Sequence, residues 1–135
     1  MAYWLIKSEP SSFSWDDQVK RGTANWDGVR NFQAAANLKA MKKGDRCFFY
    51  HSVDEKQIVG IVEVVKEAYP DPKDPTGKFV QVDVKTVRPV PKPVTLAQIK
   101  AEPSLKDLPL IRQSRLSVSP VDAAAWKTIS KMAGL

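Results

Sequence analysis

Cys47-Phe48-Phe49-Tyr50-His51 and the residues from Ile58 to Val65 decide how this chain folds. The first stretch is rich in aromatic residues. The second is rich in branched aliphatic residues, interrupted by Gly60, and both compositions are typical of β-strands. Polar residues from Ser52 to Gln57 lie between them. The sequence therefore predicts two antiparallel strands joined by a hairpin loop.

N-terminal to this hairpin, the sequence predicts one strand and two helices. Tyr3 to Ile6 is a short apolar run typical of a buried strand. Ser14-Trp15-Asp16-Asp17 resembles a capping box with aspartate in place of glutamate, and it opens a helix that we expect to end at Gly22. Good helix formers from Phe32 to Lys43 predict a second helix, with Asn31 as its N-cap.

C-terminal to the hairpin, proline-rich segments flank a further strand. Tyr69 to Gly77 contains three prolines and predicts a loop. From Val80 onward, valines alternate with polar residues, the pattern of a strand with one solvated face. Because proline has no backbone N–H, we expect the strand to end where the chain becomes an extended connector at Pro89, Pro91 and Pro93.

The last third of the chain predicts two helices and a final strand. Thr95 is placed to cap a short helix that runs to Lys100, and Asp122 is placed to cap the closing helix. Between them, apolar and polar residues alternate from Gln113 to Ser119, which suggests a strand. About five strands with helices gathered between and after them favour an α+β fold, a small curved sheet or barrel.

Length and charge limit the domain organisation and the partner. The chain has 135 residues, 43% of them apolar, which predicts a single domain over residues 1–135 with its own core. Its 21 lysines and arginines exceed its 15 aspartates and glutamates, leaving a net charge of +6. This charge favours a polyanionic partner such as nucleic acid.

The single cysteine, Cys47, excludes an internal disulfide and a zinc site built from cysteines. We expect no metal site and no cofactor. No apolar run approaches the length of a membrane span, so we expect no membrane partner. The sequence favours a monomer in the cytoplasm, or in the nucleus if the organism is eukaryotic.

Catalytic motifs are missing from the chain. His51 is the only histidine, and on a regular strand Cys47 would lie about 13 Å from it, too far to share a proton. The sequence has no phosphate-binding glycine loop and no dinucleotide fingerprint. A carboxylate base remains open, with Glu9, Asp27 and Asp83 as candidates, but the sequence favours a noncatalytic protein.

Trp26-Asp27-Gly28-Val29-Arg30-Asn31 is the stretch that best suits a ligand. It combines a flat aromatic face, a flexible glycine, a guanidinium and an amide in non-periodic sequence, which is suitable chemistry for holding a planar heterocycle. The alternative is a surface turn whose tryptophan folds back into the core.

Three other sites carry candidate binding groups. Lys7-Ser8-Glu9 directly follows an apolar strand, where the rim of a barrel would place polar side chains. His51 lies at the mouth of the predicted hairpin. Arg115, flanked by Ser114 and Ser117, can pair either with a phosphate or with an acidic neighbour such as Glu9.

Six stretches occur in order along the chain: Tyr3-Trp4-Leu5-Ile6-Lys7-Ser8-Glu9-Pro10, Trp26-Asp27-Gly28-Val29-Arg30-Asn31, Phe49-Tyr50-His51-Ser52, Val59-Gly60-Ile61, Ala68-Tyr69-Pro70-Asp71-Pro72 and Ser114-Arg115-Leu116-Ser117-Val118. Together they resemble the EVE domain family. The resemblance implies an α+β fold of the PUA-like superfamily, a mixed β-barrel of about five to six strands with flanking helices. It also implies reading of a modified base, chiefly methylated or hydroxymethylated cytosine in DNA.

The resemblance and the residue chemistry together imply that one base is flipped into an aromatic and polar pocket. The expected base-binding residues are Ser8, Glu9, Trp26, Gly28, Val29, Asn31, Tyr50, His51 and Ser52. The expected phosphate-binding residues are Lys7, Arg30, Ser114, Arg115 and Ser117. Two positions depart from the family pattern, since Phe32 replaces a common tyrosine and Ala35 a common arginine.

Two alternatives fit the same sequence features. One is an RNA-binding module of the PUA-like type that acts in RNA modification or stress metabolism. The other is a small-molecule or nucleoside pocket protein built on the same barrel. No feature of the sequence separates DNA from RNA as the partner.

Overall fold

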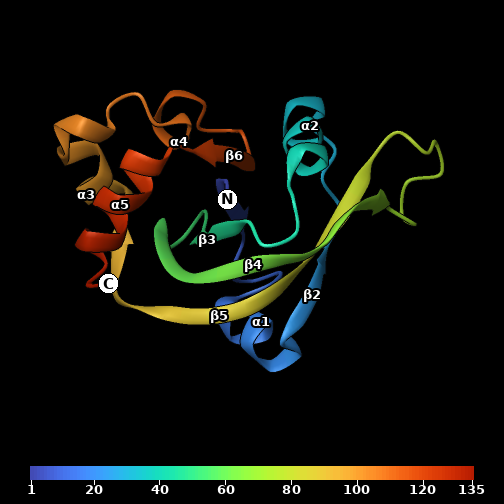
Figure 1. Ribbon diagram of the computed structural model, residues 1–135, viewed down its shortest axis with the longest axis horizontal. Helices are drawn as coiled ribbons and strands as arrows, with labels where there is room; N and C mark the ends of the chain where they lie inside the picture. The colour runs from blue at the N-terminus through green and yellow to red at the C-terminus, as the bar shows by residue number, and fades with distance from the viewer.

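The computed structural model describes residues 1–135 as one mixed sheet with helices on both faces (Figure 1). The six strands are β1 (Tyr3–Ser8), β2 (Thr23–Trp26), β3 (Arg46–His51), β4 (Gln57–Pro70), β5 (Val80–Thr95) and β6 (Val118–Val121). The helices are α1 (Trp15–Arg21), α2 (Phe32–Ala40), α3 (Leu96–Ala101), α4 (Pro109–Arg112) and α5 (Ala123–Met132), with a 3₁₀ turn at Pro103–Leu105. This architecture confirms the predicted α+β class.

The strands are ordered β2-β5-β4-β3-β1-β6. Strand β1 pairs in parallel with β3, while the other neighbours are antiparallel, including the predicted β3–β4 hairpin. Helix α2 contacts β4 and β5 as well as the opposite edge strand β6, to which the Asn37 amide donates a 2.7 Å bond at the Val118 carbonyl. The sheet therefore curves around α2 in the manner of a barrel.

The central strands are buried on both faces, so that successive side chains enter two different cores. Ile6 and Phe49 pack with α1 and α2, whereas Leu5 and Phe48 pack with α3, α4 and α5. Figure 1 shows α3, α4 and α5 gathered at one end of the molecule, away from α1 and α2. This double burial explains why β1 and β3 read as nearly continuous apolar runs in the sequence.

The predicted N-caps are confirmed. The side chains of Ser14, Asn31, Thr95 and Asp122 each accept a bond from a backbone N–H in the first turn of a helix. Helix α2 is shorter than predicted, because it ends at Ala40 rather than at the lysine pair that follows.

The buried carboxylate of Asp45 accounts for this early end. It accepts bonds from the backbone N–H of Lys42 at 2.9 Å and from the indole N–H of Trp4 at 3.0 Å. Met41 is already in an extended conformation. The chain therefore turns toward β1 before another helical turn can form.

The prediction that prolines end the fifth strand is wrong. Strand β5 continues through Pro89, Pro91 and Pro93 to Thr95. Pro89 lies opposite Gly60 and Val94 lies opposite Ile58, so six residues of β5 face only three of β4. Within such a bulge most residues have no ladder partner, and the missing proline N–H groups cost little.

Two other strand boundaries differ from the prediction. The β4–β5 hairpin is longer than expected, because Tyr69 and Pro70 still pair with Gln81 and Val80 before the loop begins. Figure 1 shows this hairpin projecting beyond the sheet. Conversely, β6 begins only at Val118, and the residues before it form a turn.

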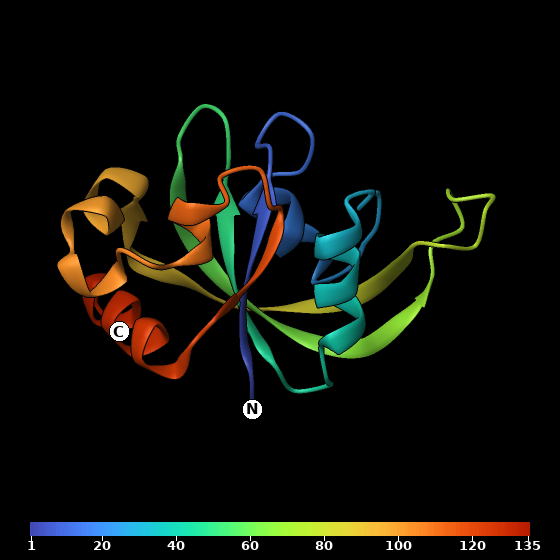
Figure 2. The ribbon, with the colours of Figure 1, turned by 90° about the horizontal axis from the view of Figure 1, so that it is seen from above.

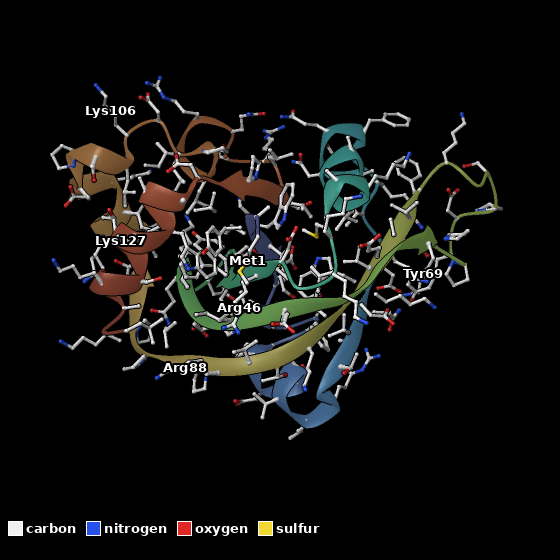
Figure 3. The ribbon with its side chains drawn as sticks, in the orientation of Figure 1. Met1, Arg46, Tyr69, Arg88, Lys106 and Lys127 are labelled. Carbon is white, nitrogen blue, oxygen red and sulfur yellow. The ribbon has the colours of Figure 1, made fainter.

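Basic side chains project from the surface at several places (Figure 3). Figure 3 shows Lys106 and Lys127 projecting outward from the side that carries α3 to α5, and both are exposed. No helix of the protein is long and apolar enough to cross a membrane.

Gly60 is required by the close approach of Trp15. A Cβ atom at this position would overlap the six-membered ring of Trp15. We expect Gly60→Ala to lower the free energy of unfolding by about 1–3 kcal/mol through overpacking, measured by urea denaturation. In a Trp15→Phe background, whose ring is smaller, the same change should cost less. Equal costs in the two backgrounds would contradict this packing argument.

Candidate functional site

The main cavity has a volume of about 480 Å³ and lies where β1 and β2 end and the chain enters β6. Its wall is mainly polar, with three hydrophobic residues. The lining residues are Lys7, Ser8, Glu9, Ser12, Phe13, Arg21, Asn25, Trp26, Asp27, Gly28, Val29, Arg30, Lys73 and Ser117. Eight of them belong to the set expected from the sequence.

Trp26 is part of the core and of the cavity wall at once. It ends strand β2, where it pairs with Val82, and is only 8% exposed. Its ring meets the rings of Phe49 and Phe13 edge to face, with centroids 5.5 Å and 6.1 Å away. Trp26 is therefore buried, as the alternative of a tryptophan folded into the core predicts. Phe13 adds a second aromatic wall that was not predicted from the sequence.

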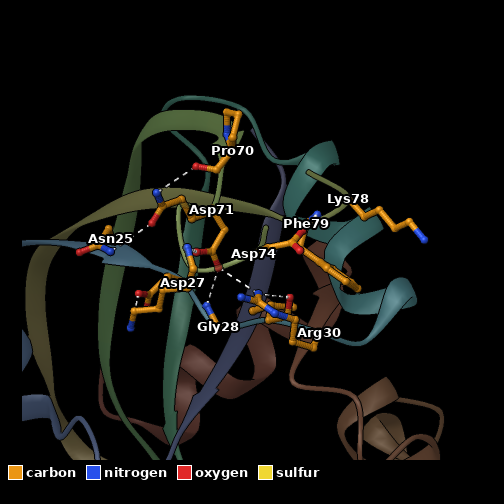
Figure 4. A network of polar contacts seen from close by, with 12 residues as sticks. Asn25, Asp27, Gly28, Arg30, Pro70, Asp71, Asp74, Lys78 and Phe79 are labelled. Carbon is orange, nitrogen blue, oxygen red and sulfur yellow. Dashed lines mark hydrogen bonds and ion pairs between the residues drawn. The ribbon is translucent and has the colours of Figure 1, made fainter. Parts of the chain in front are cut away.

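The carboxylate of Asp71 fixes the loop that follows Trp26 (Figure 4). Its Oδ2 accepts bonds from the Gly28 N–H at 2.8 Å and from Nη1 of Arg30 at 3.0 Å. Its Oδ1 accepts the Lys73 N–H at 2.9 Å. Gly28 has a φ of +77°, a left-handed conformation that glycine adopts without strain. One buried side chain thus joins the β2–α2 loop to the β4–β5 hairpin.

These donors also set the charge state of Asp71. Burial alone raises the pKa of a carboxyl, but the bonds from Gly28, Lys73 and Arg30 outweigh it, so that the pKa of Asp71 lies below its ordinary value. The group is therefore an anion at neutral pH. It holds the guanidinium of Arg30 at the cavity rim, where that side chain is 40% exposed.

A second series of polar contacts runs from the cavity lining to the β4–β5 hairpin. The guanidinium of Arg21 lies over the Phe13 ring and donates to the Asn25 side chain at 2.8 Å. The Asn25 amide donates to Gln81 at 3.1 Å, and Gln81 donates to the Pro70 carbonyl at 3.2 Å. Asn25 is thereby held with its amide at the cavity surface.

Lys7 connects the cavity to the loop before β6. Its Nζ donates to the Ser114 carbonyl at 2.8 Å, and burial lowers the pKa of this lysine. Ser117 of the same loop lines the cavity. Arg115 is exposed and forms no ion pair, so the expected alternative of a pair with Glu9 is not present.

Several expected binding residues lie outside the cavity lining. Asn31 caps α2, and Tyr50 points into the core on the opposite face of the sheet. His51 is buried, with Nε2 accepting the Trp15 N–H at 2.9 Å and Nδ1 contacting Glu55 at 3.2 Å. These three side chains have structural partners instead of facing the cavity.

Ser52 also has a structural role. Its N–H donates to the Ser8 carbonyl at 2.9 Å, which holds the β3–β4 loop beside the loop after β1. Figure 2 shows the two loops side by side. Neither Ser52, Ser114 nor Arg115 lines the cavity, although the last two lie in the loop that supplies Ser117.

The cavity carries an excess of positive charge, since four basic residues line it against two acidic ones. Asp27 is paired with Lys73 at 2.8 Å, whereas Glu9 has no ion pair or side-chain hydrogen bond. Donors, one free carboxylate and aromatic rings thus meet in one place. A planar heterocycle with both donor and acceptor edges matches this arrangement.

Sequence reasoning missed six lining residues, and only one of them had a local signal. Asp27 belongs to the stretch singled out as ligand-like, but it was named only as a candidate carboxylate base and not as a binding residue. The other five are supplied by the β1–α1 loop (Ser12 and Phe13), α1 (Arg21), β2 (Asn25) and the hairpin loop (Lys73). Nothing in their local sequence distinguishes them from ordinary surface residues.

Comparison with known protein families identifies the family to which the chain belongs. The EVE domain matches residues 2–132. The chain belongs to the EVE domain family. Human thymocyte nuclear protein 1 is 37% identical over 155 residues, which cover 89% of this chain and 68% of that protein. The chicken protein of the same name is 39% identical, with 63% of its length covered.

Several solved structures resemble this chain over its whole length. An NMR structure from Rhodopseudomonas palustris is 56% identical, with a TM-score of 0.94 over 99% of this chain and 94% of that one. The crystal structure of human thymocyte nuclear protein 1 in complex with DNA containing 5-methylcytosine has a TM-score of 0.94 at 33% identity, covering 100% and 99% of the chains. The predicted PUA-like fold is thereby confirmed.

A more distant likeness concerns the fold alone. The YTH domain of Zygosaccharomyces rouxii MRB1, solved with N6-methyladenosine RNA, has a TM-score of 0.62 at 16% identity, covering 98% of this chain and 86% of that one. The architecture is therefore shared beyond the EVE domain family.

The role of Asp71 predicts a local effect. We expect Asp71→Asn to speed amide hydrogen exchange at Gly28 about tenfold or more, because a bond to a charged acceptor becomes a bond to a neutral one. Since the folded pKa of Asp71 is lowered, its contribution is present above the ordinary carboxyl pKa and is lost as the pH falls through the folded pKa. The variant should therefore lose less stability on acidification.

Asp74→Asn is the matched control for this variant. Asp74 lies in the same hairpin loop but accepts from Thr76 and Phe79 rather than from the β2–α2 loop. It should lower stability without changing exchange at Gly28. Equal exchange effects from the two variants would show that Asp71 holds the hairpin and not the β2–α2 loop.

Proposed function

We propose that this protein is a noncatalytic nucleic-acid-binding module that receives one modified base, of the 5-methylcytosine class in DNA, in the cavity beside Trp26. The observation that carries the proposal is the likeness of the whole chain to the human relative solved with DNA containing 5-methylcytosine. Relatives from human and chicken that match most of this chain carry the name thymocyte nuclear protein 1.

The chemistry of the cavity supports a flipped cytosine. The free carboxylate of Glu9 is an acceptor for the exocyclic amino group of cytosine, the pairing that acidic side chains favour. Donors for the ring nitrogen and the carbonyl oxygen are available from Asn25 and Arg30. A 5-methyl group needs an apolar surface, which Trp26 and Phe13 offer.

The energetics require the aromatic wall. Flipping one base costs a few kcal/mol of unstacking, and contact with aromatic side chains returns about 1–3 kcal/mol per base. Because Trp26 is also packed in the core, its replacement by alanine is expected to cost about 3–5 kcal/mol of stability. Trp26 is therefore a poor probe of binding, and residues that line the cavity without supporting the core are better ones.

The direct test is a fluorescence titration of matched duplexes with 5-methylcytosine or cytosine at one position. The proposal expects tighter binding of the modified duplex. Equal affinity for both duplexes would overturn it. A matched RNA and free 5-methyldeoxycytidine complete the comparison, because preference for the RNA would support the RNA-binding alternative. Binding of the nucleoside as tight as that of DNA would instead support a small-molecule pocket.

Glu9 tests the reading of the base edge. We expect Glu9→Gln to weaken binding of the modified duplex by about 1–3 kcal/mol, because the amide loses the negative charge and half of the acceptor capacity. Asp54→Asn is the matched control, since it changes the net charge equally at an exposed residue outside the cavity lining. The same loss of affinity in both variants would show that Glu9→Gln acts through the net charge alone.

Arg115 tests the phosphate contact. It is exposed in the loop that supplies Ser117 to the cavity. We expect Arg115→Ala to weaken modified and plain duplexes alike and to reduce the slope of log K against log salt by about 0.9, the value for one phosphate. Arg112→Ala removes an equally charged side chain that is already paired with Asp107, and should leave the slope unchanged. An unchanged slope in both variants would contradict the contact.

A further inference from the structure

Phe32 is an exposed aromatic side chain beside the cavity rim. The residue is 69% exposed, whereas the other large apolar residues that are exposed are Met1, Val19, Val53 and Leu135, none of which has a ring. Phe32 begins helix α2, where an apolar side chain in solvent contributes little to folding. The packing of the protein therefore does not explain why this residue is exposed.

The ring is nevertheless held in place. Phe32 stacks on Phe79 of the β4–β5 hairpin, with centroids 5.1 Å apart and an angle of 29° between the planes. Phe79 packs against the core, and its backbone N–H donates to Asp74 at 2.8 Å. One face of Phe32 thus rests on an anchored ring, while most of its surface remains open to solvent.

Arg30 connects this stack to the cavity. Its guanidinium lies 5.3 Å from the centroid of the Phe79 ring, and the same residue lines the cavity. Figure 4 shows Arg30 and Phe79 together beside the bonds of Asp71. The two rings and the guanidinium therefore form a continuous surface that begins at the cavity rim.

Two cations lie near the stack, the guanidinium of Arg30 and the ammonium group of Lys78. Lys78 precedes Phe79 in the chain, is exposed and forms no ion pair. An open aromatic face beside the free ammonium group of Lys78 and the partly exposed guanidinium of Arg30 matches a nucleotide, whose base stacks and whose phosphate is anionic. An apolar protein surface would gain nothing from the free ammonium group.

We propose that the Phe32–Phe79 stack is a second base subsite, on which a nucleobase that neighbours the base in the cavity stacks against the open face of Phe32. This inference rests on the proposed function and adds to it a contact outside the cavity. Stacking on a flanking base is independent of the modification. It raises affinity for the polymer over the free nucleoside.

The test is a double-mutant cycle between Phe32→Ala and an abasic site. Binding is measured for duplexes with one 5-methylcytosine and an abasic residue at each neighbouring position in turn. We expect Phe32→Ala to weaken binding of the intact duplex roughly 5- to 150-fold, the range of one base–aromatic stack. One abasic position should cause a similar loss in the wild-type protein, and little further loss in the variant.

Two controls isolate the stack. Phe32→Tyr keeps the ring and should bind as the wild type does, and Val53→Ala removes another exposed apolar side chain and should have no effect. Unchanged binding by Phe32→Ala would overturn the inference. So would a result in which, at every abasic position, the loss from the abasic site simply adds to the loss from Phe32→Ala. The ratio of modified to plain DNA is a separate readout. A ratio of one in the wild-type protein would overturn the proposed function. A Phe32 variant that binds more weakly but keeps the wild-type ratio would show that its effect is confined to the subsite.

Discussion

The buried carboxylate of Asp71 joins the two segments that form one side of the cavity. A charge removed from water is costly unless it is fully hydrogen-bonded, and here three N–H donors from Gly28, Arg30 and Lys73 provide the compensation. Because moving either segment would leave the charge uncompensated, this group, together with the ion pair between Asp27 and Lys73, fixes the position of the β2–α2 loop relative to the β4–β5 hairpin. The cavity is therefore organised before any ligand arrives.

The aromatic wall is rigid for a different reason. Trp26 belongs to a strand and packs edge to face on Phe49, which lies in the middle of the sheet. A wall that is continuous with the core loses little conformational freedom on binding, and this lowers the entropic cost of association. Because the ring also packs in the core, replacing it would destabilise the fold. We therefore expect differences in ligand choice between related cavities to come from polar rim residues such as Glu9 and Asn25.

Local signals in the sequence predicted the helix starts well, because a cap such as Ser14 or Asn31 acts within one turn. The face that each strand residue occupies was harder. Period-two alternation puts Phe49 and His51 on one face and Tyr50 on the other, but it does not say which face adjoins the cavity. Phe13 was missed because only the tertiary fold brings its loop to Trp26.

Arg30 illustrates why an ion pair does not remove a residue from binding. A guanidinium has five N–H donors, and only Nη1 is engaged, with Asp71 at 3.0 Å and the Val29 carbonyl at 3.1 Å. The donors on Nε and Nη2 remain free on a side chain that is 40% exposed. The pair with Asp71 therefore orients the planar group, and its free edge is left at the cavity rim. A contact to a phosphate or a base there would cost less side-chain entropy than the same contact from an unpaired arginine.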